Sequence, residues 1–158
     1  MTVHVAERKG ASEVREGRVP FETVLKECTA FIFVTPLDDT TRNMIDEAEL
    51  TTMKPSALIV NVGRGGVVNE KALAQALKEG KIGGAGTDVF ENEPATRETS
   101  PLLDPEVPNI SLTPHVAWYA SSTVNGTIST QKANLEGWVR GKPQNVVLQG
   151  KQADPLHE

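Results

Sequence analysis

The chain has 158 residues, of which 38% are hydrophobic and 23% are charged, and its formal net charge is -5. This composition is typical of one globular domain with its own hydrophobic core. The acidic balance argues against a nucleic-acid partner, and no apolar run approaches the roughly 20 residues that span a bilayer. The single cysteine, Cys28, leaves no second thiol for a disulfide or a metal cluster, so we expect a cytoplasmic protein without a metal site.

Apolar, β-branched runs alternate with helical patterns along the chain, which is typical of a parallel sheet wrapped by helices. The first run, residues 2–6, predicts a strand, and the polar stretch that follows predicts a loop over residues 10–18. Apolar residues at helical spacing predict a helix over residues 21–28. The run AFIFVT, residues 30–35, then predicts a strand that Pro36 ends.

The middle of the chain continues this alternation. We expect Asp46 to cap a short helix, and the continuous apolar run ALIVNV, residues 57–62, predicts a strand buried on both faces. Asn69 is expected to cap a helix over residues 70–79 that ends at a glycine. Another strand is predicted over residues 83–89.

Residues 91–108 are rich in proline and have no hydrophobic period, so they predict a long ordered loop. Loops of this length are usually functional. A short strand over residues 109–112 and a long helix over residues 121–140 complete the predicted elements.

Two residues able to carry chemistry follow strands directly. Arg64 stands between glycines at the carboxyl end of a predicted strand, where ligands bind in open α/β sheets, and its planar fork suits a carboxylate. The alternative is a turn with a solvated cation. His115 follows another strand, and its imidazole can donate a proton near neutral pH, although a surface histidine without a role is the more common case.

Three segments resemble the signatures of the D-isomer-specific 2-hydroxyacid dehydrogenases: VNVGRGGVVNE (60–70), GAGTDVFENEP (84–94) and LTPHVAW (112–118). Their order and spacing match as well. Residues 7–24 resemble in particular the glycerate dehydrogenase, or hydroxypyruvate reductase, branch of this family. The resemblance implies a Rossmann-type domain inserted into a substrate domain, with NAD(H) or NADP(H) as cofactor and a small 2-oxo or 2-hydroxy acid as substrate. It also implies a possible homodimer in the full-length form.

The resemblance further implies three catalytic residues. Arg64 would bind the substrate carboxylate, and His115 would be the general acid that protonates the carbonyl oxygen. Glu93 would bind and orient the imidazolium. Glu91 and Glu93 are equal candidates by residue type, and only the match to the family motif selects Glu93.

The cofactor site is implied in the same way. Asp88 would accept a hydrogen bond from the nicotinamide carboxamide, with a turn cap as the alternative role. Glu7 stands where an acid binds the ribose hydroxyls of a cofactor without a 2′-phosphate, but Arg8 and Lys9 beside it could pair with that phosphate, so the choice between NAD and NADP stays open. Further residues would line the adenosine, phosphates and nicotinamide, with simple packing an equal alternative for the last of them: Thr35, Pro36, Thr41, Val62, Gly63, Arg64, His115 and Trp118.

The resemblance also implies a glycine-rich G-x-G-x-x-G loop about 20 residues before Glu7, and the sequence contains none. We therefore expect an incomplete Rossmann-like α/β sheet that lacks its first strand and this loop, with Met1 an internal methionine of a longer sequence. The expected organisation is a partial dinucleotide-binding domain over residues 1–120, a helix returning to the substrate domain over 121–148, and a disordered tail over 149–158.

Two functions of different class follow. The first is hydride transfer between NAD(P)H and a small 2-oxo acid, with hydroxypyruvate and glycerate or glyoxylate and glycolate as the substrate pair. The second is a non-catalytic remnant that binds a nucleotide weakly or associates with an intact paralogue.

Overall fold

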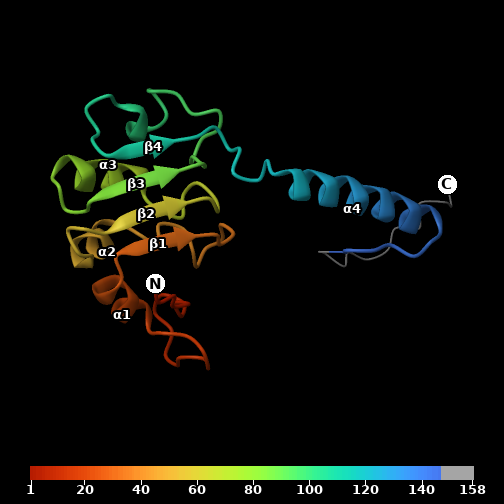
Figure 1. Ribbon diagram of the computed structural model, residues 1–158, viewed down its shortest axis with the longest axis horizontal. Helices are drawn as coiled ribbons and strands as arrows, with labels where there is room; N and C mark the ends of the chain where they lie inside the picture. Colours follow the sequence, from red (N-terminus) through yellow and green to blue (C-terminus); the bar gives the residue numbers. More distant parts are fainter. Residues whose placement is uncertain (147–158) are drawn as a thin grey trace. The chain divides into compact units, whose positions relative to one another are not determined.

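The computed structural model describes residues 1–146, so the predicted tail over residues 149–158 lies outside the described residues. The chain forms two compact units, Met1–Ala117 and Trp118–Glu158. The first unit contains a sheet of four parallel strands with helices beside it (Figure 1), which confirms the predicted Rossmann-like α/β class. The second unit contains the helix α4 (Ser121–Val139), close to its predicted bounds.

The sheet has the strand order β1-β2-β3-β4, so neighbours in space are also neighbours in sequence. Its strands are β1 (Ala30–Phe33), β2 (Leu58–Asn61), β3 (Gly84–Thr87) and β4 (Ile110–Leu112). The elements between and before them are α1 (Phe21–Glu27), α2 (Glu47–Thr52), α3 (Glu70–Lys78) and the 3-10 helix η1 (Pro101–Leu103). Because all four strands are parallel, the segments that follow them meet along one edge of the sheet.

Both predicted helix caps are present. Asp46 forms a capping box with Glu49 at the start of α2. The side chain of Asn69 accepts from the backbone N–H groups of Lys71 and Ala72 at the start of α3, at 3.0 and 3.2 Å. These bonds satisfy N–H groups that have no partner inside a helix, and each such cap stabilises its helix by about 1 kcal/mol.

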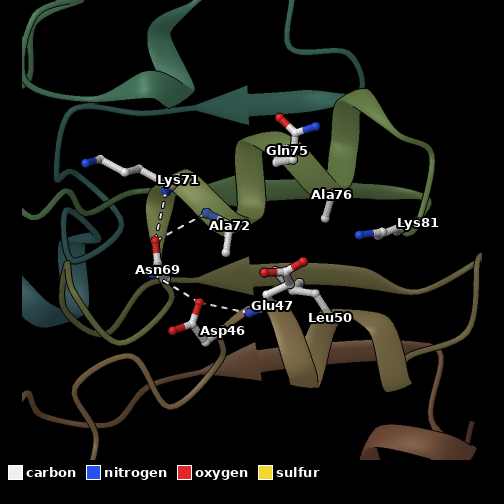
Figure 2. A pocket seen from close by; sticks show the side chains of 9 residues that line it. All are labelled: Asp46, Glu47, Leu50, Asn69, Lys71, Ala72, Gln75, Ala76 and Lys81. Carbon is white, nitrogen blue, oxygen red and sulfur yellow. Dashed lines mark hydrogen bonds between the residues drawn. The ribbon is translucent and has the colours of Figure 1, made fainter.

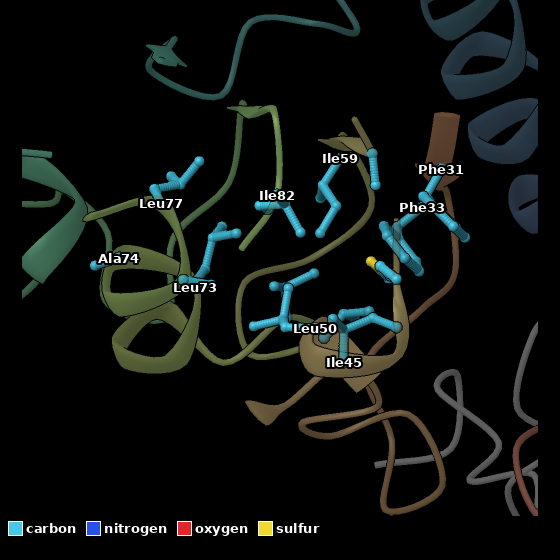
Figure 3. Close-up of a cluster of buried hydrophobic side chains, with 14 of the residues drawn as sticks. Phe31, Phe33, Ile45, Leu50, Ile59, Leu73, Ala74, Leu77 and Ile82 are labelled. Carbon is cyan, nitrogen blue, oxygen red and sulfur yellow. The ribbon is translucent and has the colours of Figure 1, made fainter. Parts of the chain in front are cut away.

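The hydrophobic core lies between one face of the sheet and the helices. Helices α2 and α3 lie on the same side of the strands in Figure 1, and alternate residues of β1 and β2 are buried against them. Figure 3 shows how the strand residues Phe31 and Ile59 and the helix residues Leu50 and Leu73 gather in one cluster. Full burial of a side chain of this size contributes roughly 1.5–3 kcal/mol, so this cluster fixes how the helices sit on the sheet.

Two expectations about the strands are wrong. Residues 2–6 form no strand, because their only ladder contact within residues 1–146 is an isolated bridge between Ala6 and Val19, and a strand needs a neighbour along its length. Strand β2 is not buried on both faces. Leu58 is 51% and Val60 40% exposed, since no helix of the first unit covers that face within residues 1–117.

The long loop over residues 91–108 is ordered as expected but contains η1, which the sequence pattern does not indicate. Among the residues that the structure describes, no helix is both long enough and apolar enough to cross a membrane.

Candidate active site

The loop that carries Arg64 is shaped by Asn61, the last residue of β2. The Asn61 side chain is buried, accepts from the N–H of Gly63 at 3.1 Å and donates to the carbonyl oxygen of Arg64 at 3.0 Å. The guanidinium of Arg64 is exposed at the carboxyl edge and donates to the Gly63 carbonyl at 2.7 Å. Sequence reasoning missed Asn61, although a polar residue inside an otherwise apolar strand was a signal for it.

Gly65 brings the Arg64 loop against the segment that follows β3. A Cβ atom at Gly65 would lie 1.9 Å from the carbonyl oxygen of Phe90 and 2.4 Å from the amide nitrogen of Glu91. No side chain fits at such a distance, so only glycine permits this approach of two backbones. The contact joins the loop of Arg64 to the segment that leads to Glu93.

His115 and Glu93 form a direct pair. The Nδ1 atom of His115 lies 2.7 Å from Oε2 of Glu93, and Oε1 of Glu93 accepts from the backbone N–H of Phe90 at 2.9 Å. The hydrogen bond from His115 lowers the pKa of Glu93 below its ordinary value, burial opposes this, and the Phe90 amide supports it. Glu91, the other candidate, has its carboxylate 3.8 Å from the guanidinium of Arg42 instead.

Asp88 holds the segment that carries His115. This carboxylate is only 3% exposed, and it accepts from the hydroxyl of Thr113 at 2.5 Å and from the backbone N–H groups of Val116 and Ala117, both at 2.8 Å. Burial alone would raise the pKa of Asp88, but these hydrogen bonds outweigh it and hold the pKa below its ordinary value. His115 itself has a positive φ of 56°, a conformation that needs such external support.

Several residues predicted to line the cofactor lie along the same edge. The hydroxyl of Thr35, just after β1, is buried without a hydrogen-bond partner among the described residues, so a polar group of a ligand could satisfy it. A Cβ atom at Gly63 would lie 2.7 Å from the Thr35 carbonyl oxygen, which brings the ends of β1 and β2 together. Val62 is 37% exposed beside them. An unsatisfied hydroxyl next to apolar surface fits a bound nucleotide.

Two other members of the predicted lining serve the loop after β1. Pro36 is exposed, and its carbonyl oxygen accepts from the Thr41 hydroxyl at 2.8 Å. The Thr41 hydroxyl in turn accepts from the N–H of Asp38 at 2.8 Å. The Thr41 hydroxyl is therefore used within the loop itself, so Pro36 and Thr41 would contact a ligand mainly through their backbone groups.

Glu7 is already engaged by the chain itself. Its buried carboxylate accepts from the backbone N–H groups of Arg8 and Arg15, at 2.8 and 3.0 Å, and pairs closely with the guanidinium of Arg15. The guanidinium of Arg15, followed by the two amides, holds the pKa of Glu7 far below its ordinary range. Ribose hydroxyls would have to compete with these donors, so the predicted ribose contact of Glu7 stays a prediction.

Replacing Arg15 by glutamine should destabilise the fold above about pH 4.5, the ordinary pKa of this carboxyl. A carboxylate with a depressed pKa contributes stability above its unfolded pKa and loses that contribution as the pH falls toward its folded pKa. The free energy of unfolding, measured with urea between pH 3 and 8, should therefore be lower in the variant at neutral pH, and the difference should narrow as the pH falls below 4.5. A difference of the same size at every pH would contradict the ionic contact.

Trp118 belongs to the second unit, where it is 52% exposed and makes an edge-to-face contact with Tyr119 at a ring distance of 5.4 Å. Its place in the cofactor lining stays a prediction.

A cavity of about 300 Å³ lies elsewhere, between α2 and α3 (Figure 2). None of the predicted site residues lines it. Two of its polar residues are the helix caps Asp46 and Asn69, which bond to each other at 3.0 Å and to backbone N–H groups. We assign no ligand to it.

Comparison with known proteins now bears on this geometry. Residues 1–117 match the model of the D-isomer specific 2-hydroxyacid dehydrogenase, NAD binding domain. The chain belongs to this family. Among the relatives, the glycerate dehydrogenase of Methylorubrum extorquens is 44% identical over 133 residues, which are 84% of this chain and 42% of that protein. Residues 1–117, which match the family model, contain every predicted site residue except Trp118.

Solved structures agree with this assignment. The NAD-complexed D-isomer specific 2-hydroxyacid dehydrogenase from Lactobacillus delbrueckii ssp. bulgaricus has a TM-score of 0.69 and 30% identity, and the match covers 83% of this chain and 43% of that one. An acyclic imino acid reductase (Bsp5), solved with NADPH and D-Arg, has a TM-score of 0.74 and 27% identity, with 91% and 46% covered. The chain thus spans less than half the length of the first curated relatives it matches.

Proposed function

We propose that this chain carries the catalytic residues of an oxidoreductase that transfers a hydride between NAD(P)H and a small 2-oxo or D-2-hydroxy acid. The observation that carries the proposal is the contact of 2.7 Å between His115 and Glu93, at the edge of the sheet where Arg64 also stands. A histidine held by a carboxylate can donate a proton, and an exposed arginine at the same edge of the sheet can bind an anion. Hydroxypyruvate and glycerate are the preferred substrate pair, with glyoxylate and glycolate as the alternative.

Each residue has a separate task in this reaction. The nicotinamide cofactor, when bound, supplies the hydride that reaches the carbonyl carbon. Arg64 binds the substrate carboxylate through its planar fork and so orients the carbonyl group. His115 transfers a proton from Nε2 to the carbonyl oxygen as that oxygen becomes an alkoxide, and Glu93 at Nδ1 fixes the ring. Hydride and proton together convert the 2-oxo acid to a 2-hydroxy acid.

The finer assignments belong to the same proposal. The partial dinucleotide-binding domain spans residues 1–120, and the segment from residue 121 on, which contains α4, returns toward a substrate domain. The protein is cytoplasmic, and the full-length form is a homodimer. Both NADH and NADPH remain candidate cofactors, because the Arg15 guanidinium paired with Glu7 weakens the case for strict selection of NAD.

The second candidate is a non-catalytic module that binds a nucleotide weakly or associates with an intact relative. The observation that favours it is the exposure of apolar side chains on one sheet face, where Ile32 is 68% and Leu58 51% exposed. Exposed apolar surface of this kind favours association.

One assay separates the two candidates. The purified chain is mixed with NADH or NADPH and with hydroxypyruvate or glyoxylate, and nucleotide oxidation is followed by absorbance. Any turnover should depend on Arg64, because Arg64→Ala should raise the KM for the 2-oxo acid about 10- to 100-fold, the effect of losing charge-assisted hydrogen bonds. The matched control is Arg97→Ala, at an exposed loop arginine, which should leave KM unchanged. Turnover that Arg64→Ala weakens would support the first proposal for this chain by itself. A folded chain without turnover would show that it does not complete the cofactor site alone and would favour the second candidate for the isolated chain.

A further inference from the structure

Glu70 is the first residue of α3, but its carboxylate does not cap the helix. Asn69 already caps α3, and Glu70 is only 6% exposed. Its Oε1 atom accepts from the backbone N–H of Glu91 at 2.6 Å, and its Oε2 atom accepts from the hydroxyl of Ser100 at 2.5 Å. One buried carboxylate therefore bonds to both ends of the loop over residues 91–100.

The bond from the Glu91 amide to Glu70 lies next to the bond from the Phe90 amide to Glu93, the carboxylate that pairs with His115. Consecutive N–H groups of one turn donate to two carboxylates: that of Phe90 to Glu93 at 2.9 Å and that of Glu91 to Glu70 at 2.6 Å. The other oxygen of Glu93 then meets Nδ1 of His115 at 2.7 Å. A rotation of this turn would therefore move the Phe90 amide and the Glu93 carboxylate together.

The contact with Ser100 anchors the far end of the same loop. Ser100 is 2% exposed, and its hydroxyl oxygen also accepts from the N–H of Leu102 at the start of η1. Since η1 packs against α3, this end of the loop is tied to the same helix that bears Glu70. Glu93 thus lies in a segment held at both ends by one side chain.

We propose that Glu70 is a positioning residue for proton transfer, because it holds the loop over residues 91–100 so that Glu93 meets His115. The inference rests on the proposed function for the purpose of that pair, but the contact itself can be tested without turnover. Glu70 would act through the peptide between Phe90 and Glu91, and it touches neither substrate nor cofactor.

The pKa of Glu93 shows whether Glu93 still meets His115, because a loss of that contact and a loss of charge at Glu70 shift this pKa in opposite directions. The charged groups that face Glu93 are His115, which lowers its pKa, and Asp88, which raises it. Loss of the hydrogen bond to His115 would raise the pKa of Glu93 toward its ordinary value of 4.5. Merely removing a nearby negative charge at Glu70 would lower it instead. A change in position and a change in charge therefore move the titration in opposite directions.

The test is a pH titration of the Glu93 side-chain carboxyl by 13C NMR in the whole chain, with the resonance assigned by its loss in Glu93→Gln. We expect Glu70→Ala to raise the titration midpoint toward 4.5 and Ser100→Ala to raise it less. Glu70→Gln keeps the length of the side chain and an acceptor for the Glu91 amide, so it should show no rise. The matched control is Glu47→Ala, at the exposed first residue of α2, which should leave the midpoint unchanged.

A midpoint in Glu70→Ala that is unchanged or lower would overturn the proposal. If Glu70→Ala does not fold, Glu70→Asp decides, because it keeps the negative charge at the start of α3 but is one methylene too short to reach both partners. A raised midpoint in Glu70→Asp supports the proposal, and a wild-type midpoint contradicts it. If the turnover assay fails while Glu70→Ala still raises the Glu93 midpoint, the proposed function loses its support, whereas the structural part of the inference, that Glu70 holds Glu93 against His115, stands.

Discussion

Replacing His115 by glutamine should lower kcat/KM for the 2-oxo acid by a factor of about 10²–10⁴, the usual contribution of a general acid. Glutamine can still donate a hydrogen bond near Glu93, but it cannot transfer a proton to the developing alkoxide. The imidazole contacts Glu93 through Nδ1, which leaves Nε2 as the atom that gives its proton to the substrate. An amide has no group of comparable acidity at that place. The measurement is the initial rate of NADH or NADPH oxidation at several concentrations of hydroxypyruvate.

His4 provides the control for this substitution. It is exposed near the start of the chain, so His4→Gln should leave the rate unchanged. Equal loss in both variants would point to misfolding, and wild-type turnover in His115→Gln would remove this residue from the mechanism. Binding of the 2-oxo acid should persist in His115→Gln, because Arg64 is intact.

Asp88→Ala should have the second largest effect, because it acts on both stability and catalysis. Removing this buried carboxylate leaves the hydroxyl of Thr113 and the N–H groups of Val116 and Ala117 without their acceptor. Water can reach these segments, so we expect a loss of about 1–3 kcal/mol in the free energy of unfolding. The segment that carries His115 at positive φ would also relax, and a displacement of about 1 Å there can lower kcat about 100-fold.

Urea unfolding and turnover of the same samples check both parts of this expectation. The stability difference should be largest above about pH 4 and shrink at lower pH, because a carboxylate with a depressed pKa stabilises the fold only while it is ionised. Asp39→Ala, at an exposed loop position, is the control. If Asp88→Ala has normal stability but reduced affinity for the nucleotide, Asp88 contacts the nicotinamide and does not hold the segment that carries His115.

The sequence predicted the four α-helices within the described residues and the caps of α2 and α3 correctly, for local reasons. Caps such as Asp46 and Asn69 act on the nearest backbone N–H groups, so their effect can be read from neighbouring residues. The placement of Arg64 and His115 after strands follows from the common edge of a parallel sheet. These features depend on a few adjacent residues and on strand direction.

The failed strand predictions have a different cause. The apolar pattern of residues 2–6 is that of a strand, but a strand forms only where a neighbour pairs with it, and residues 1–146 offer only the bridge at Val19. The continuous run that forms β2 suggested burial on both faces, yet burial depends on what packs against each face. Pattern alone carries no information on either point.

What the sequence by itself determined is therefore the α/β class, the order of its elements and the residue types that meet at the sheet edge. The tertiary structure decided which carboxylates do what: Glu93 faces His115, Asp88 holds the His115 segment, and Glu7 is bound by Arg15. It also brought in Glu70, whose partners lie 21 and 30 positions away. The physical reason is that the hydrogen-bond donors around a carboxylate set its contacts and its pKa. Those donors come from segments that only the packing of the sheet brings together.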